Sequence, residues 1–105
     1  MIFQFHTHDV TFFGEEKAYF EKRLSRLIKF LGNEAGDEDS VKANIHIEKD
    51  KHTSGDKFHA KAHITCPHGG SFHAELDSED IKSLADKLRD TLEIQVKKFH
   101  EKKLS

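Results

Sequence analysis

The sequence predicts an α+β domain in which a four-stranded mixed sheet carries two helices on one face, in the order β-α-β-β-β-α. Two long segments repeat apolar residues at helical spacing, and four short segments alternate apolar and polar residues with period two. Each segment has one apolar side, so two layers suffice to bury all of them. A chain of 105 residues fits one such core, and we expect residues 1–105 to form a single domain.

The first strand and the first helix follow directly from these patterns. Ile2–Thr7 places Phe3 and Phe5 on the same side at period two, which is typical of a strand. Across Glu15–Leu31 the apolar residues recur at helical spacing, which predicts one amphipathic helix that Gly32 ends. These apolar residues are Phe20, Leu24, Leu27, Ile28 and Leu31.

Three further strands are expected to form an antiparallel meander. Val41–Ile47, Phe58–Cys66 and Phe72–Leu76 each alternate apolar and polar residues. The acidic run 33–40 is predicted to be a mobile loop, and 50–56 a turn-rich connection. The first strand-helix-strand unit is expected to cross over through its helix, so its two strands lie parallel, and this crossover is expected to be right-handed.

The turn at Pro67, His68 and Gly69 sets the register of the last two strands. It places Ile64 opposite Phe72 inside and His63 opposite His73 outside.

A second helix closes the predicted domain. It starts near Ser78, a plausible N-cap, with Glu79 and Asp80 in its first turn, and ends near Lys102. Its apolar positions are Ile81, Leu84, Ala85, Leu88, Leu92, Val96 and Phe99.

The charge of the chain restricts its partners. Its 17 basic and 19 acidic residues give a formal net charge of −2, whereas nucleic-acid binders are usually basic overall. Any nucleic-acid surface must therefore arise from the distribution of charge. Nine histidines add a second property, because mild acid would make the protein net positive.

Several classes of function are disfavoured. No segment approaches the roughly 20 apolar residues of a membrane span, and Met1–Val10 lacks the features of a signal peptide. Cys66 is the only cysteine and lies on the inward register of a strand, so we expect a core residue in a reducing cytoplasm. Without a phosphate loop or a convergent acid–base pair, we expect no enzyme, no cofactor and no small-molecule substrate.

Two groups of basic residues are candidates for phosphate contacts. Lys22, Arg26 and Lys29 stand at i, i+4 and i+7 on the outer side of the first helix, with Arg23 on its flank. The end of the second helix carries Lys97, Lys98, His100, Lys102 and Lys103. A solvated helix face would explain the first group, and C-terminal capping part of the second. If both groups form one surface, the acidic residues 37–39 must lie away from it.

The histidines offer a rival hypothesis. His63 and His73 are expected to lie close enough to share one metal ion or one proton, which makes them weak candidates for a metal site. We expect no specific metal site.

The order of these elements resembles the ribosome hibernation promoting factors and ribosome-associated inhibitor proteins, also called sigma-54 modulation proteins. The resemblance covers almost the whole chain. It depends on the register Tyr19, Arg23, Leu24, Arg26 and Leu27, the turn 67–69, the acidic pair 79–80 before Ile81, and the run 92–98.

The resemblance implies a fold like that of double-stranded-RNA-binding domains. It further implies that Lys22, Arg23, Arg26, Lys29, Lys97, Lys98 and Lys102 contact small-subunit rRNA in the decoding region. The expected function is ribosome hibernation during stress, in which translation is inhibited because mRNA and tRNA are blocked. The chain resembles the short form of the family, so we expect a cytoplasmic monomer off the ribosome that does not dimerise ribosomes alone.

The main alternative is a non-ribosomal RNA-binding module, or a His-rich module that binds a metal or a protein.

Overall fold

The computed structural model describes residues 1–12, 14–31, 40–49 and 57–104, with the backbone alone at 100 and 102–104. The elements are β1 (Ile2–His8), α1 (Gly14–Ser25), α2 (Ile28–Leu31), β2 (Lys42–Lys49), β3 (Phe58–Thr65), β4 (Ser71–Ser78) and α3 (Ile81–Leu104). This order confirms the predicted α+β fold. Gly32, which was predicted to end the first helix, residues 33–39 of the acidic run and the connection 50–56 lie outside the described residues.

The four strands form one sheet in the order β1-β2-β3-β4. β1 is parallel to β2, and the remaining pairs are antiparallel, as the crossover and the meander predict. Ile64 pairs with Phe72 and His63 with His73, which confirms the expected register. The turn between β3 and β4 needs a left-handed residue, and Gly69 supplies it with φ of 103°.

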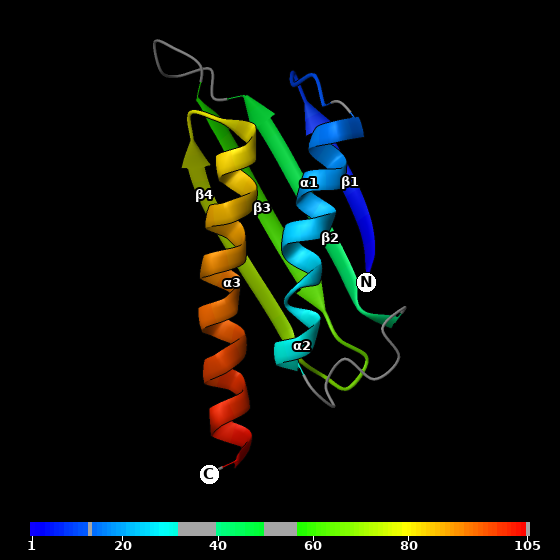
Figure 1. Cartoon of the computed structure of the whole chain (residues 1–105), viewed down its shortest axis with the longest axis vertical. Coiled ribbons are helices and arrows are strands. Elements are labelled where there is room, and N and C mark those ends of the chain that lie inside the picture. The colour runs from blue at the N-terminus through cyan, green and yellow to red at the C-terminus, as the bar shows by residue number, and fades with distance from the viewer. Residues whose placement is uncertain (13, 32–39, 50–56, 105) are drawn as a thin grey trace.

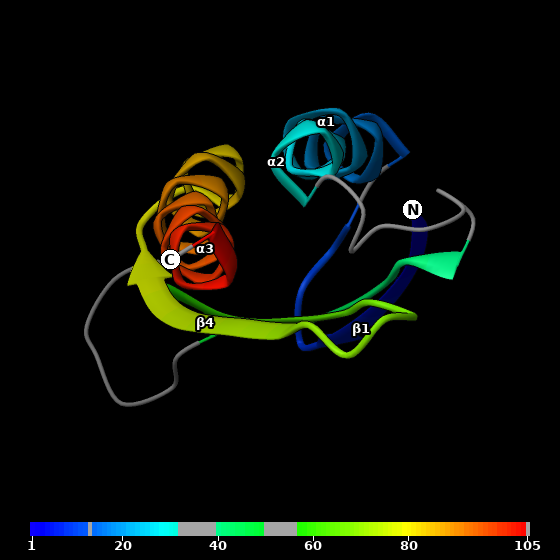
Figure 2. The ribbon, with the colours of Figure 1, turned by 90° about the horizontal axis from the view of Figure 1, so that it is seen from below.

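The helices α1, α2 and α3 form one layer on one face of the sheet, and the described elements leave the opposite face uncovered (Figures 1 and 2). The core between the layers contains aliphatic side chains from every strand except β1, together with Phe20, Leu24 and Leu27 of the first helical segment. Phe3 and Phe5 of β1 pack against this core while half-buried. Cys66 is buried, as its register predicts. No helix within the described part of the chain is long and apolar enough to span a membrane.

The helix predicted over residues 15–31 is divided between Ser25 and Ile28. The Ser25 hydroxyl donates to the carbonyl of Glu21 at 2.5 Å, a contact that bends helices. The amide of Leu27 then bonds to Leu24 three residues back, at 3.0 Å, so the helix tightens by one residue. The apolar side of the segment still faces the core, because Leu27 and Leu31 are buried.

The N-cap of the last helix differs from the prediction. Ser78 is the buried last residue of β4, and α3 begins at Ile81. Asp80 takes the capping position instead, because its carboxylate accepts two hydrogen bonds from Ser83. One comes from the backbone amide at 3.3 Å and the other from the Ser83 hydroxyl at 3.2 Å. A carboxylate at this end is also favoured by the helix dipole.

Candidate nucleic-acid interface

The predicted cations of the first helical segment divide into two kinds. Lys22, Arg26 and Lys29 are accessible from solvent, as their outward register predicts. Arg23 is turned toward α3, where it pairs with an acidic side chain. The first three side chains are therefore available to a ligand, whereas Arg23 is engaged within the protein.

Arg23 belongs to a polar cluster that joins α1 to α3. Its Nε lies 3.1 Å from Oδ1 of Asp86, and its guanidinium lies 5.1 Å from the ring centre of Tyr19. The Tyr19 hydroxyl donates to the same carboxylate at 3.0 Å. Lys82 completes the cluster 5.7 Å from the Tyr19 ring, with its Nζ 3.4 Å from Oε1 of Glu15. This cluster balances part of the positive charge of Arg23.

A shallow groove lies between α2 and α3, and we call it the Phe30 groove. It has a volume of about 190 Å³. Its lining residues are Arg26, Leu27, Lys29, Phe30, Arg89 and Glu93.

The Phe30 ring brings the two predicted basic groups together. Lys29 places its Nζ 5.4 Å from the ring centre, and Lys97 of α3 places its Nζ 4.8 Å from the same centre. An ammonium over an aromatic face is attracted by the ring quadrupole, so both cations are held at the groove. Glu93 pairs with Lys97 at 3.5 Å and is the acidic residue in the lining.

Arg89 is a groove cation that the sequence pattern did not single out. It precedes Lys97 by eight residues on α3, so the two lie on one helix face with Glu93 between them. Arg89 was missed because no other basic residue lies close to it in the second half of the sequence except Lys87. Helical spacing alone would have shown that Arg89 shares a helix face with Lys97. Its Nη2 lies 2.6 Å from Asp90, and this hydrogen bond raises the pKa of Arg89, which stays charged at any physiological pH.

Lys98, another predicted cation of α3, is not among the residues that line the groove. Lys98 is exposed, but consecutive helical residues project about 100° apart, so it points away from the side that carries Lys97. Lys102 lies within the backbone of α3, and its side chain is outside the described residues. Of the predicted cations, Arg26, Lys29 and Lys97 therefore gather around Phe30, and Lys98 lies on another side of α3.

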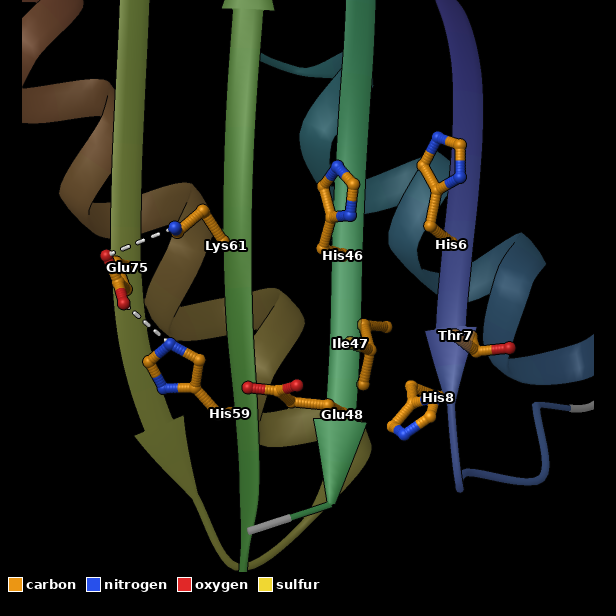
Figure 3. A pocket seen from close by; sticks show the side chains of 9 residues that line it. All are labelled: His6, Thr7, His8, His46, Ile47, Glu48, His59, Lys61 and Glu75. Carbon is orange, nitrogen blue, oxygen red and sulfur yellow. Dashed lines mark hydrogen bonds and ion pairs between the residues drawn. The ribbon is translucent and has the colours of Figure 1, made fainter.

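The uncovered face of the sheet carries a histidine between two acids. His59 lies between two carboxylates, with its Nδ1 bonded to Asp77 and its Nε2 2.7 Å from Glu75. The pKa of His59 is raised above its usual value, chiefly by the hydrogen bond with Asp77. Burial lowers this pKa, and the hydrogen bond with Glu75 raises it further. Figure 3 shows the contact with Glu75.

The two histidines considered for a metal lie together as predicted. The rings of His63 and His73 are 6.2 Å apart, edge to face, and the Nε2 of His63 bonds to the Ser71 hydroxyl at 2.7 Å. Within the described residues, no group of three or more His, Cys, Asp or Glu side chains is arranged to hold a metal ion. The expectation that no specific metal site exists stays a prediction.

Comparison with known proteins adds to this geometry. A search of curated protein sequences found no match. The N-terminal domain of Thermus thermophilus Protein Y has a similar structure, with a TM-score of 0.74 at 24% identity over 93% of this chain and 97% of that one. A ribosomal subunit interface protein from Coxiella burnetii has a TM-score of 0.73 at 22% identity, over 96% of this chain and 99% of its own. These likenesses confirm the fold.

The family follows from the sequence itself. The model of the family described as "Sigma 54 modulation protein / S30EA ribosomal protein" matches residues 3–104, nearly the whole chain. The chain therefore belongs to the sigma-54 modulation protein and S30EA ribosomal protein family, a family of ribosome-associated proteins.

Proposed function

We propose that this protein is a ribosome hibernation factor that binds small-subunit rRNA in the decoding region and thereby blocks mRNA and tRNA. The protein is a cytoplasmic monomer when it is off the ribosome. It acts by occupying its site on the small subunit, without catalysing a reaction. Membership of a ribosome-associated family supports the partner. The structural likeness to a ribosomal subunit interface protein supports a site between the subunits.

The cluster of cations at the Phe30 groove is the observation that carries the proposal. Arg26, Lys29, Arg89 and Lys97 meet there from α2, the turn before it and α3. They outnumber the two nearby acids, Glu93 and Asp90, which pair with Lys97 and Arg89. This local excess of positive charge exists although the whole chain has a net charge of −2. Phosphate contacts depend on the local potential, so a segregated patch suffices to hold rRNA.

Two cations at the groove are already held in place before RNA binds. Both are held over one aromatic ring, which reduces the freedom they lose on binding. Lys22 extends the patch along α1, and Lys98 supplies a flanking contact from the other side of α3. Arg23 takes part once its carboxylate partner is replaced by a phosphate.

Neutralising the groove tests this assignment. We expect the Arg26→Gln/Lys97→Gln variant to bind isolated small subunits at least about tenfold more weakly at low salt, because two phosphate contacts are lost. The slope of log affinity against log salt should become shallower by about 1.4 to 1.8 for the same reason. Binding is measured by cosedimentation over a series of salt concentrations, and circular dichroism verifies the fold.

A variant with the same change in net charge provides the control. Lys57→Gln/Lys87→Gln removes two cations from a site away from the groove, where the neighbours include Asp77 and Glu79. This control should bind nearly as tightly as the wild type. Equal losses in both variants would show that only net charge matters and would refute the groove as the contact site. Wild-type binding to a short free RNA that is as tight as binding to subunits would instead favour a non-ribosomal RNA-binding module.

A further inference from the structure

The uncovered face of the sheet is an ordered array of outward side chains. Alternate residues of the four strands point away from the helices and form four cross-strand rows. The first row holds Ile2, Lys42, Thr65 and Ser71, the second Gln4, Asn44, His63 and His73, the third His6, His46, Lys61 and Glu75, and the fourth His8, Glu48, His59 and Asp77. We call this surface the histidine face, because it carries six of the nine histidines of the sequence.

Imidazoles on the histidine face lie in close pairs. The rings of His6 and His46 are stacked with their centres 4.5 Å apart, and both side chains are exposed. Figure 3 shows them side by side, projecting from β1 and β2 at a depression of about 450 Å³ that also reaches His8 and His59. His63 and His73 form a second pair 6.2 Å apart. Two protonated rings at such distances repel each other, and an anion that lies beside both rings offsets this repulsion.

Proton uptake reverses the charge of this surface. With neutral histidines, Lys42 and Lys61 stand against Glu48, Glu75 and Asp77, which gives 2 − 3 = −1. With all six histidines protonated the sum becomes −1 + 6 = +5. The helices lie on the other side of the sheet (Figure 2), and Asp9 pairs with His8 at the edge of the histidine face at 3.5 Å.

The charge is distributed unevenly along the strands. The first and second rows contain no acidic residue, and they carry Lys42, His63 and His73. The acids gather in the third and fourth rows, where Glu75 and Asp77 already hold His59. An anion therefore meets the least repulsion at the end formed by the first two rows and the adjoining His6 and His46 pair.

We propose that the histidine face is a second RNA-contacting surface, on the opposite side of the domain from the Phe30 groove, which binds phosphates when its imidazoles are protonated. The inference extends the proposed function, since it assigns the same RNA partner to a second face. Rows repeat about every 6.6 Å along the strands, so an extended polyanion can neutralise several rows at once. The stacked rings of His6 and His46 also present an aromatic surface on which bases stack, and this favours RNA over an acidic peptide.

A short single-stranded RNA tests the histidine face without the ribosome. The probe is a fluorescent oligouridylate of about 12 residues, a length within the range that single-stranded nucleic-acid sites cover. It is titrated at constant ionic strength at about pH 7.5 and about pH 6.0, between which histidine ordinarily takes up its proton. We expect wild-type affinity to rise about tenfold at the lower pH, and the salt slope to steepen by about 1.4 to 2.8, as expected for two to four additional contacts with single-stranded phosphates.

Substitution of four histidines should abolish this response. His6→Gln/His46→Gln/His63→Gln/His73→Gln keeps polar, exposed side chains that do not titrate, and we expect its affinity to change less than about twofold between the two pH values. The matched control His68→Gln alters an exposed residue in the turn outside the rows and should behave like the wild type. An equal pH response in the fourfold variant, or none in the wild type, would overturn the proposal.

Two other occupants are distinguished in the same experiment. Displacement of the RNA by polyglutamate at equal charge concentration would show a surface that responds to charge alone, and would overturn the assignment to RNA. Dimers of the wild type at the lower pH, seen by sedimentation velocity and absent in the fourfold variant, would overturn it in favour of a second copy of the chain. The Arg26→Gln/Lys97→Gln variant separates the two faces, because it should lose small-subunit binding and keep the pH response.

Discussion

Asp86 is the position at which stability and RNA affinity should change in opposite directions. Its carboxylate accepts the Tyr19 hydroxyl at 3.0 Å and lies 3.1 Å from the Nε of Arg23, so it connects α1 to α3. The same carboxylate neutralises a cation of the proposed interface. Asp86→Asn keeps the shape of the side chain, removes the negative charge and leaves one oxygen to accept a hydrogen bond.

The cost in stability follows from the exposure of the pair. The side chains of Arg23 and Asp86 are 30% and 43% exposed, so solvent screens their attraction. We expect Asp86→Asn to lower the free energy of unfolding by about 1 kcal/mol, which corresponds to a fall in Tm of about 4 to 8 °C for a domain of this size. Thermal and urea unfolding, followed by circular dichroism, measure both quantities. Glu79→Gln removes one charge from an exposed residue that forms no ion pair with the described residues, and should leave stability within about 0.5 kcal/mol.

The effect on RNA binding has the opposite sign. Release of Arg23 adds one phosphate contact, so Asp86→Asn should tighten small-subunit binding on the order of threefold and steepen the salt slope by about 0.7 to 0.9. The gain should vanish in the Arg23→Gln background, where no cation is released. An equal gain in that background would show a general charge effect and refute the role given to Arg23. A gain of the same size in Glu79→Gln would refute it as well.

Three further predictions concern single side chains. The pKa of His59 is raised, so its positive charge stabilises the fold at low pH, and this stabilisation is lost as the pH rises through that pKa. His59→Gln should therefore lower the free energy of unfolding in urea by about 0.5 to 1 kcal/mol at about pH 5.5 and by almost nothing at about pH 8.5. Equal costs at both pH values would contradict the ion contacts of His59. Asp80→Ala removes the cap of α3 and should lower the free energy of unfolding by about 1 kcal/mol. A larger loss in Ser78→Ala than in Asp80→Ala would instead identify Ser78 as the cap. Leu92→Ala empties a fully buried position and should cost about 2 to 5 kcal/mol by chemical denaturation, so a cost below about 1 kcal/mol would mean that α3 does not pack as described.

The sheet was predictable because its signals are local. Period-two alternation identified β2, β3 and β4, and the turn at 67–69 determined that His63 faces His73. The array on the histidine face follows from that register once β1 is paired with β2. The break at Ser25 was missed because a helix that tightens by one residue keeps its apolar side inward, so the periodicity continues across the break.

The candidate site was only partly predictable, because it combines residues from two helices. Helical spacing showed that Arg26 and Lys29 face outward, yet it gives no information on which part of α3 lies beside them. The packing of α2 against α3 brings Lys97 and Arg89 to Phe30 and leaves Lys98 on another side. The cap at Asp80 was missed for a different reason, since Ser78 and Asp80 are both good caps and the end of β4 decides between them.

Competition on the small subunit tests the central claim most directly. Isolated small subunits, either vacant or loaded beforehand with mRNA and tRNA, are incubated with the protein and sedimented at low salt. If the protein occupies the decoding region, it will sediment with vacant subunits and be excluded from loaded ones, and excess protein will release mRNA and tRNA. Equal amounts of protein on vacant and loaded subunits would contradict a mechanism of occlusion in the decoding region.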